Sequence, residues 1–295
     1  MSDSDFSIFE SDEENIKEYI VAIELWHHII DNLKDFLNHF TLTAPTIVDE
    51  IDMFGKLPNK YPREASRMLM NTTFMFRAFL DHMNSLFSRK YGKNSKNLKD
   101  WEKIQSKEYD ECFCYRFVYK LRNYMQHVGS PPLLWKTRHV QDINSIEIEA
   151  FLDKEELLSN YNEWGALLKR ELREDTSDIN AIELMRAWGD SFYRLLRGLV
   201  SIMESQAIES AFRVAKLREK FSEEGELRLY HWPGEHTQDK DTLIFREVSE
   251  KDANLIIKGY PFDVNKNLIL EYRTRNLQDL IAKAKAGLIP GVLPA

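Results

Sequence analysis

Glycine and proline are scarce in this chain, at 11 and 9 of 295 residues. Both residues interrupt helices and concentrate in turns, and apolar residues recur at helical spacing over long stretches. These two patterns together predict a mainly α-helical protein. The hydrophobic content of 43% is ordinary for a folded chain of this length, which can bury one large core or two moderate ones. Disorder of the whole chain is thereby excluded.

Other absences limit the location and the chemistry. No apolar run approaches the length of a membrane span and there is no secretory h-region, so we expect no membrane partner. The two cysteines, Cys112 and Cys114, are separated by one residue, which predicts a reducing, cytoplasmic compartment and buried thiols instead of a zinc site. The chain has no Gly-x-x-x-x-Gly-Lys loop, which excludes the commonest nucleotide hydrolases. Glu24-x-x-His27 has no second copy, which argues against a di-iron centre.

The chain divides into three segments by composition. Six acidic residues and no basic residue occur within residues 1–14, and we interpret residues 1–12 as an acidic flexible tail. Residues 13–222 are predicted to form one helical domain, interrupted by a β-hairpin at about 133–151 where apolar and polar residues alternate. Residues 223–295 are predicted to form a small C-terminal α+β module.

The expected elements follow from the change of period along the chain. Helices are predicted over residues 13–40, 44–55, 62–90, 108–128, 153–174 and 178–221. A Thr/Pro turn at residues 41–45 closes the first helix, and Pro62 opens the third. In the C-terminal module we expect short strands at residues 227–232, 242–245 and 253–257, and a helix at residues 268–286.

Basic residues gather in one part of an otherwise acidic chain. Residues 112–140 contain five basic and no acidic residues, whereas the formal net charge of the chain is −8. Local basicity of this kind marks a place where an anion can dock. At 100° per residue, the helix over 108–128 has an apolar stripe and two polar flanks. The stripe is Cys114, Val118, Leu121, Met125 and Val128; one flank is Arg116, Lys120, Asn123 and His127; the other is Tyr115, Tyr119, Arg122 and Gln126.

Arg122 and His127 lie about 140° apart on a regular helix. One chain alone would therefore struggle to close both side chains on a single phosphate. A two-fold dimer would bring two arginines and two histidines into one cleft, and unwinding near Gly129 is another way to re-aim His127. These groups suit RNA cleavage by the 2′-hydroxyl, which needs a base, an acid and positive charge on the phosphate. A helix C-terminus favours a cationic imidazole. This chemistry needs no metal or other cofactor, and DNA is not a substrate for it.

The motif Arg122-Asn123-x-x-x-His127 resembles the signature of HEPN-domain ribonucleases, α-helical proteins of toxin–antitoxin and phage-defence systems and of RNA-targeting CRISPR effectors. The polar residue after the arginine belongs to that resemblance. The Gly-Ser-Pro-Pro turn at 129–132, the hairpin, and residues 153–158 with Trp164 are similar to the layout of bacterial HEPN-like proteins. The similarity spans residues 13–221.

The resemblance implies an HEPN-like helical bundle that works as a homodimer with a composite active site. Its catalytic residues would be Arg122, Asn123 and His127, and RNA cleavage would leave a 2′,3′-cyclic phosphate. An antitoxin or another regulatory partner would control the activity. The candidate contacts to the RNA substrate are Arg116, Tyr119, Lys120 and Gln126.

Other interpretations of the motif remain open. Arg122 and His127 also fit a surface arginine and a helix-ending histidine, and Asn123 either orients the site or is only solvated. Tyr115 and Tyr119 either stack on bases or, as we favour, pack in the core or an interface.

The chain contains a second arginine–histidine pair of the same spacing. Arg77 and His82 lack the polar second residue and fall in the middle of a predicted helix, so we interpret them as structural. A non-catalytic helical module that dimerises or binds RNA is the alternative function for the whole chain.

Overall fold

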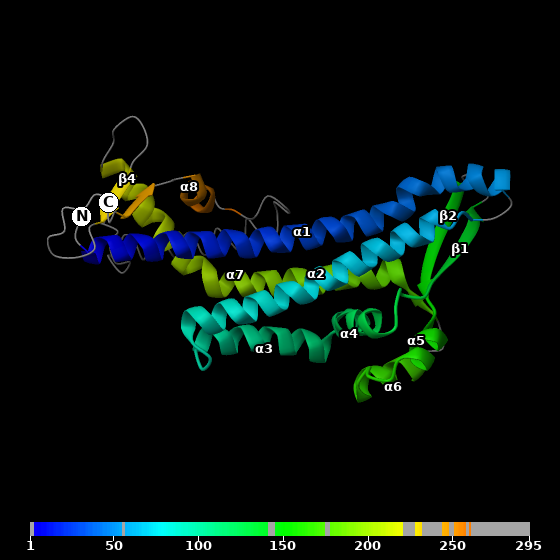
Figure 1. The fold of residues 1–295 in the computed structure, drawn as a ribbon. Coiled ribbons are helices and arrows are strands. Elements are labelled where there is room, and N and C mark those ends of the chain that lie inside the picture. Colours follow the sequence, from blue (N-terminus) through cyan, green and yellow to red (C-terminus); the bar gives the residue numbers. More distant parts are fainter. Residues whose placement is uncertain are drawn as a thin grey trace. The chain divides into compact units, whose positions relative to one another are not determined.

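The computed structural model describes residues 3–54, 57–140, 145–174, 178–220, 228–231, 244–247, 251–257 and 260 (Figure 1). These residues are mainly helical, as predicted. The elements are α1 (Asp3–Phe54), α2 (Lys60–Tyr91), α3 (Lys96–Glu111), α4 (Phe113–His127), β1 (Leu133–Val140), β2 (Ser145–Leu152), α5 (Lys154–Asn160), α6 (Ala166–Glu174), β3 (Ile179–Asn180), α7 (Ala181–Lys220), β4 (Arg228–His231), β5 (Ile244–Glu247) and α8 (Lys251–Ile257).

The chain forms two compact units. Glu24–Ile202 make up the helical unit, and Met1–Ile23 together with Met203–Ala295 make up the terminal unit. The sequence patterns instead predict a boundary between residues 222 and 223. They miss the pairing of the two ends because α1 and α7 are long helices that each contribute to both units.

Aromatic side chains form the core of the helical unit. The ring of Phe76 on α2 meets Trp188 and Phe192 on α7 at centroid distances of 5.1 and 5.5 Å, and Tyr115 on α4 at 5.4 Å. Trp26 of α1 stacks on Phe192 at 6.1 Å. Edge-to-face and offset contacts of this kind each stabilise the fold beyond the area they bury. The helical unit is therefore a helical bundle whose core is stabilised by contacts between aromatic side chains.

The helix expected over residues 108–128 is two helices. Cys112 has an extended backbone, with φ −114° and ψ 112°, and separates α3 from α4. The carbonyls exposed at the end of α3 are satisfied by Arg116, whose guanidinium donates to the oxygens of Tyr109 and, at 3.1 Å, of Asp110. A helix end with such a partner is stable without continuing. The helical spacing of apolar residues continues across Cys112, so the sequence pattern does not reveal the break between α3 and α4.

The predicted hairpin is confirmed. Strands β1 and β2 are antiparallel, with Trp135 opposite Ala150, and β3 adds to β2 with Asn180 opposite Phe151. The Trp135 ring packs on Phe40 of α1 at 4.9 Å, which anchors the sheet to the bundle. The expected turn at residues 141–144 lies outside the described residues.

Two predicted boundaries within the helical unit differ from the structure. Helix α1 continues through the Thr/Pro segment, where Pro45 removes one backbone donor but the Thr43 hydroxyl donates to the His39 carbonyl. The helix predicted over residues 153–174 is divided into α5 and α6. It is interrupted near Gly165, whose φ of +84° is accessible to glycine and strained for other residues.

Residues 3–12 are helical, which corrects the acidic flexible tail expected over residues 1–12. Phe6 and Phe9 are each 3% exposed in the terminal unit. Asp12, also 3% exposed, accepts hydrogen bonds from Ser210 at 2.8 Å and from Arg213 at 2.6 and 2.8 Å. Apolar residues at helical spacing, hidden among acids, provide the buried stripe that the composition conceals.

The C-terminal part of the terminal unit is described only in short pieces. Strands β4 and β5 pair antiparallel, with Tyr230 opposite Phe245, as two of the predicted strands. Residues 253–257, predicted as a third strand, belong to helix α8 instead, because Ala253 and Ile256 are buried at helical spacing. The helix predicted over residues 268–286 lies outside the described residues.

Candidate functional site

Helix α4 carries the Arg122/His127 motif. Four residues of its predicted apolar stripe are buried, and its buried face is wider than that stripe because Tyr115, Arg116, Phe117 and Tyr124 are buried as well. Cys114, Val118, Leu121 and Met125 are each no more than 7% exposed. Val128, the last member of the predicted stripe, is 41% exposed because it follows the helix end. The chain then turns at Gly129, where φ is +145°. Helix α4 therefore ends at His127, whose side chain is exposed, while Tyr124 and Met125 of the same final turn are buried.

Arg122 is held against α2. Its guanidinium donates to the side-chain oxygen of Gln126 and, at 3.3 Å, to that of Asn123. It also lies over the ring of Phe74, with 5.7 Å between the guanidinium carbon and the ring centroid. The buried Nε of Arg122 has no hydrogen-bond partner among the described residues. Two amide side chains and an aromatic face thus orient Arg122, and an unused donor remains.

His127 is exposed and faces a different neighbour. Its imidazole is parallel to the ring of Tyr161, with 6.4 Å between centroids and 8° between planes. Tyr161 lies between α5 and α6, is 6% exposed, and packs edge-on to Trp164 at 5.3 Å. Burial raises the pKa of Tyr161. Trp164 is fixed by a hydrogen bond from its ring N–H to the Leu157 carbonyl at 3.2 Å. The imidazole of His127 therefore packs against a buried aromatic cluster of Tyr161 and Trp164.

The two key side chains of the motif do not meet in one chain. Arg122 contacts Phe74 on α2, whereas His127 contacts Tyr161 between α5 and α6. This agrees with the angular separation calculated from the helix period.

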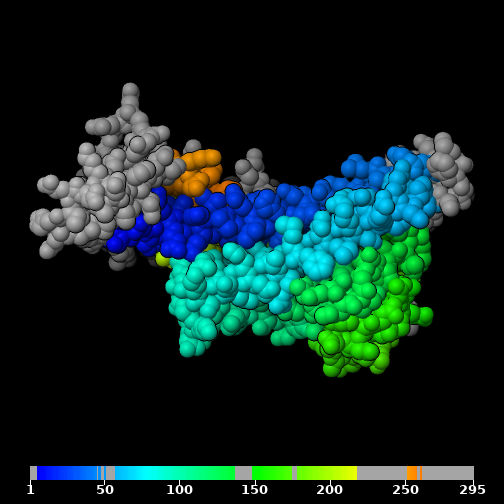
Figure 2. Space-filling model, in the orientation of Figure 1, coloured from blue at the N-terminus to red at the C-terminus, as the bar shows by residue number. Residues whose placement is uncertain are grey.

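A pocket lies beside Arg122 on the surface of α2. It has a volume of about 450 Å³, and Phe74, which lies under Arg122, is one of its walls. The other lining residues are Arg63, Ser66, Arg67, Met70, Asn71 and Ser130. We call it the α2 pocket. Side chains of α2, in light blue to cyan, reach the surface in Figure 2.

The α2 pocket has a net positive lining. Arg67 pairs with Glu64 at 2.8 Å, whereas the side chain of Arg63 makes no ion pair with any described residue. Sequence reasoning missed this pocket. The pattern that could have revealed it is the helical spacing of Arg63, Arg67, Met70 and Phe74.

Arg116 is not a candidate RNA contact, which corrects the prediction from sequence. It is 3% exposed, and its Nε donates to Glu171 of α6 at 3.1 Å. With its bonds to the α3 carbonyls, this arginine ties α3, α4 and α6 together. A helical wheel assigns Arg116 to a solvent flank because it does not include the α6 helix that covers this flank.

The other predicted RNA contacts are at least partly accessible. Lys120 is half-buried and Gln126 is exposed beside Arg122. Tyr119 accepts a hydrogen bond from Arg77, whose guanidinium lies 4.9 Å from the centroid of its ring. Tyr115 is 1% exposed and belongs to the core, as favoured from sequence. Tyr119 packs beside it at 6.5 Å, and so is held mainly by protein.

In the second arginine–histidine pair, Arg77 is held by protein contacts and His82 is exposed. Arg77 forms an ion pair with Asp81 at 3.0 Å in addition to its contact with Tyr119. Asp81 and Tyr119 therefore fix the side chain of Arg77 at the surface between α2 and α4.

Two general properties apply to the described part of the chain. Its residues include no cluster of three or more histidine, cysteine, aspartate or glutamate side chains arranged to hold a metal ion. None of its helices combines the length and the apolar character needed to cross a membrane.

Comparison of the chain with protein-family models, with curated proteins and with solved structures found no match.

Proposed function

We propose that this protein is a metal-independent endoribonuclease of the HEPN type, acting as a homodimer on RNA. The observation that carries the proposal is the C-terminal half of α4, which holds an exposed imidazole against Tyr161 and, on a different side of the helix, a guanidinium against Phe74. Catalytic groups need such prior orientation, since it removes the entropic cost of positioning them in the transition state.

The proposed reaction uses one motif from each subunit. One His127 takes the proton of the ribose 2′-hydroxyl, which attacks the adjacent phosphorus, and the other His127 protonates the departing 5′-oxygen. The products are a 2′,3′-cyclic phosphate and a free 5′-hydroxyl. The two Arg122 guanidinium groups stabilise the charge that develops on the phosphate oxygens. The separation of Arg122 from His127 within one chain is the reason that the proposal requires a dimer.

The α2 pocket is the proposed path for the flanking RNA backbone. Arg63 is available to a phosphate oxygen, and Ser66, Asn71 and Ser130 offer neutral hydrogen-bond donors in the same pocket. Phosphate contacts by arginine and by hydroxyl and amide groups supply affinity without sequence preference. Lys120 and Gln126 would extend these contacts along α4. In this proposal an antitoxin or regulatory partner restrains the activity in a bacterial defence system.

A second function is supported by the contacts of Arg122. Its guanidinium already donates to Gln126 and Asn123, which is also the behaviour of a structural surface arginine. The alternative is accordingly a non-catalytic helical module that dimerises or binds RNA with the same surface.

Single substitutions distinguish the two functions. In the catalytic case, Arg122→Ala and His127→Ala each abolish formation of 2′,3′-cyclic phosphate ends on a single-stranded RNA, with unchanged circular dichroism. Matched controls are Arg173→Ala and His82→Ala, which remove an exposed arginine on α6 and an exposed histidine on α2, and should cleave like the wild type. Cleavage should persist in EDTA and stop when the ribose at the cut site is replaced by deoxyribose. RNA binding without cleavage by the wild-type dimer would instead support the second function.

A further inference from the structure

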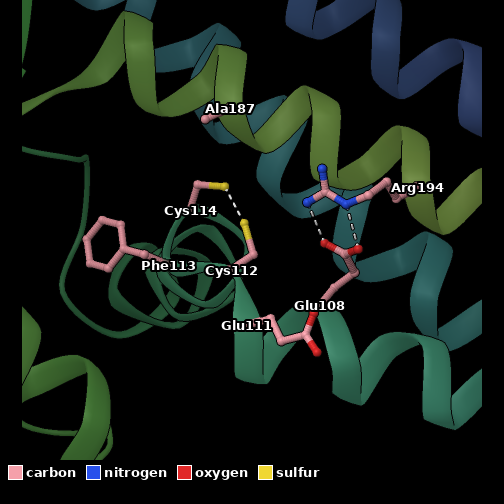
Figure 3. A pocket seen from close by; sticks show the side chains of 7 residues that line it. All are labelled: Glu108, Glu111, Cys112, Phe113, Cys114, Ala187 and Arg194. Carbon is pink, nitrogen blue, oxygen red and sulfur yellow. Dashed lines mark hydrogen bonds and ion pairs between the residues drawn. The ribbon is translucent and has the colours of Figure 1, made fainter.

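The junction between α3 and α4 holds both cysteines of the chain. Cys112 is the one non-helical residue between the two helices, and Cys114 lies in the first turn of α4. Their sulfur atoms point toward one another across 2.7 Å (Figure 3). Cys114 is 7% exposed and Cys112 is half-buried. Both thiols are therefore held together by the backbone of one short segment.

A surface pocket of about 490 Å³ gives access to this pair. Its walls include Glu108 and Glu111 of α3 and Ala187 and Arg194 of α7 (Figure 3). Arg194 donates to both carboxylate oxygens of Glu108 at 2.8 Å. A small molecule can thus reach the sulfurs, which distinguishes them from cysteines enclosed in a core.

The two thiols differ in acidity. Burial acts to raise the pKa of both. For Cys112 this effect is outweighed by the hydrogen bond with Cys114 and by the Tyr115 backbone, so its pKa is lowered, whereas the pKa of Cys114 is raised. The thiolate is the nucleophile in disulfide exchange. Cys112, the more exposed of the two, is thus the attacking group, and the buried Cys114 is the resolving group.

We propose that Cys112 and Cys114 form a redox-active dithiol that takes low-molecular-weight disulfides as oxidant and closes to an intrachain disulfide. The Cys112 thiolate attacks one sulfur of the small disulfide, giving a mixed disulfide and releasing one thiolate. Cys114 then loses its proton to that thiolate and attacks the Cys112 sulfur, and the second small thiolate leaves. Two protein thiols and one small disulfide thereby become one protein disulfide and two small thiols.

The position of the pair indicates what such a bond would affect. It would clamp the extended residue at the end of α3 to the first turn of α4, the helix whose last turn carries His127. In a reducing compartment, disulfides are transient and regulatory more often than structural. The dithiol does not depend on the function proposed for α4.

Oxidised glutathione tests the proposal on the reduced, full-length protein. Since the chain has two cysteines, both free thiols should disappear together, with no glutathione retained on the intact mass. Trypsin cleaves after Lys107 and Arg116, so peptide 108–116 should be lighter by the two thiol hydrogens. A stable glutathione adduct on the wild type, a disulfide-linked dimer, or two unreactive thiols would each overturn the proposal.

Serine variants identify the order of attack. Cys114→Ser should accumulate one glutathione per chain, on Cys112, because the resolving thiol is gone. Cys112→Ser should react at least about tenfold more slowly, since a buried thiol of raised pKa remains. Equal rates for the two variants would refute the assignment. If either variant does not fold, the wild type is compared in native buffer and in guanidinium chloride: ring closure faster in the folded state supports the site, and closure only after unfolding refutes it.

Discussion

The imidazole of His127 lies parallel to the ring of Tyr161, with 6.4 Å between their centroids and 8° between their planes. One ring ends α4 and is exposed, whereas the other is buried between α5 and α6. The stack therefore couples a solvent-facing group to a part of the fold that is far less free to move. When His127 transfers a proton in the proposed reaction, this contact fixes the orientation of its imidazole ring.

Removing the stacking ring should impair catalysis more than binding. We expect Tyr161→Leu to lower kcat for RNA cleavage by between about 10-fold and 100-fold with little change in KM, because the imidazole loses its orientation. Tyr161→Phe keeps the ring and should retain the wild-type rate. Both are measured well below the unfolding temperature of each variant. A Tyr161→Leu variant with wild-type kcat would show that the stack has no catalytic role.

Arg116 should contribute to stability and not to RNA affinity. Its substitution by methionine leaves Glu171 and the Tyr109 and Asp110 carbonyls without their shared donor, and should cost about 3 kcal/mol of unfolding free energy. Lys120→Met, one helical turn further along, should stay within about 0.5 kcal/mol of the wild type. Urea denaturation measures both. Similar losses for the two variants would contradict the distinction between these neighbouring basic residues.

The contrast between Arg116 and Arg122 shows what a sequence can reveal about the site. The period of α4 was sufficient to identify part of its buried face and the separation of Arg122 from His127, but it missed the buried Phe117 and Tyr124. The partners of these residues come from α2, α6 and the segment between α5 and α6, which are 34 to 55 positions away for Phe74, Tyr161 and Glu171. A helical wheel contains no information about them. The first residue of each predicted flank, Tyr115 or Arg116, is therefore buried by neighbouring elements, whereas the residues nearer the end of α4 are at least partly accessible.

The ends of the chain show a second limit of composition. Residues 1–12 are predicted to be a flexible tail because six acidic residues and no basic residue occur within residues 1–14. Phe6, Phe9 and the buried Asp12 nevertheless have helical spacing. The burial of Asp12 involves α7, almost two hundred positions further along, through its hydrogen bonds with Ser210 and Arg213. A polar composition favours disorder of a segment on its own, but contacts with a segment far away in the sequence can order it.

Glu108 should give the protein a pH-dependent contribution to stability. Burial alone would raise its pKa, but hydrogen bonds from Arg194 and Ser191 outweigh burial and lower it. A lowered pKa stabilises the folded state above the unfolded value of about 4.3, and this contribution is lost as pH falls through the folded pKa. Glu108→Gln should therefore cost about 1 to 3 kcal/mol at pH 7 and progressively less below pH 4.

The pH comparison has a control on the same helix. Glu111 is exposed and lies 4.0 Å from Lys107, so Glu111→Gln should change the unfolding free energy by less than about 0.5 kcal/mol at either pH. Urea denaturation at several pH values measures both variants. A stability gap between wild type and Glu108→Gln that is constant with pH would contradict the role of this carboxylate.

Two glycines of α7 should respond in opposite ways to the same substitution. A Cβ at Gly198 would lie 2.7 and 2.9 Å from the Cδ1 and Cγ2 atoms of Ile104, whereas one at Gly189 would meet Leu33 alone, at 2.9 Å from Cδ2. The branched Ile104 presents two of its carbons and cannot move both away, whereas the end of Leu33 can rotate. Gly198→Ala should therefore cost about 1 to 3 kcal/mol. Gly189→Ala should be neutral or stabilising by up to about 1 kcal/mol, since alanine favours the helix.

The cause of the Gly198 effect can be isolated by a double-mutant cycle in urea denaturation. With Ile104→Ala as background, the clash is gone and the helix propensity of alanine remains, so adding Gly198→Ala should stabilise the protein by up to about 1 kcal/mol. The coupling between the two positions then has the sign of a steric conflict. If Gly198→Ala costs the same with and without the Ile104 side chain, the close approach of α3 and α7 at this glycine is not what makes it necessary.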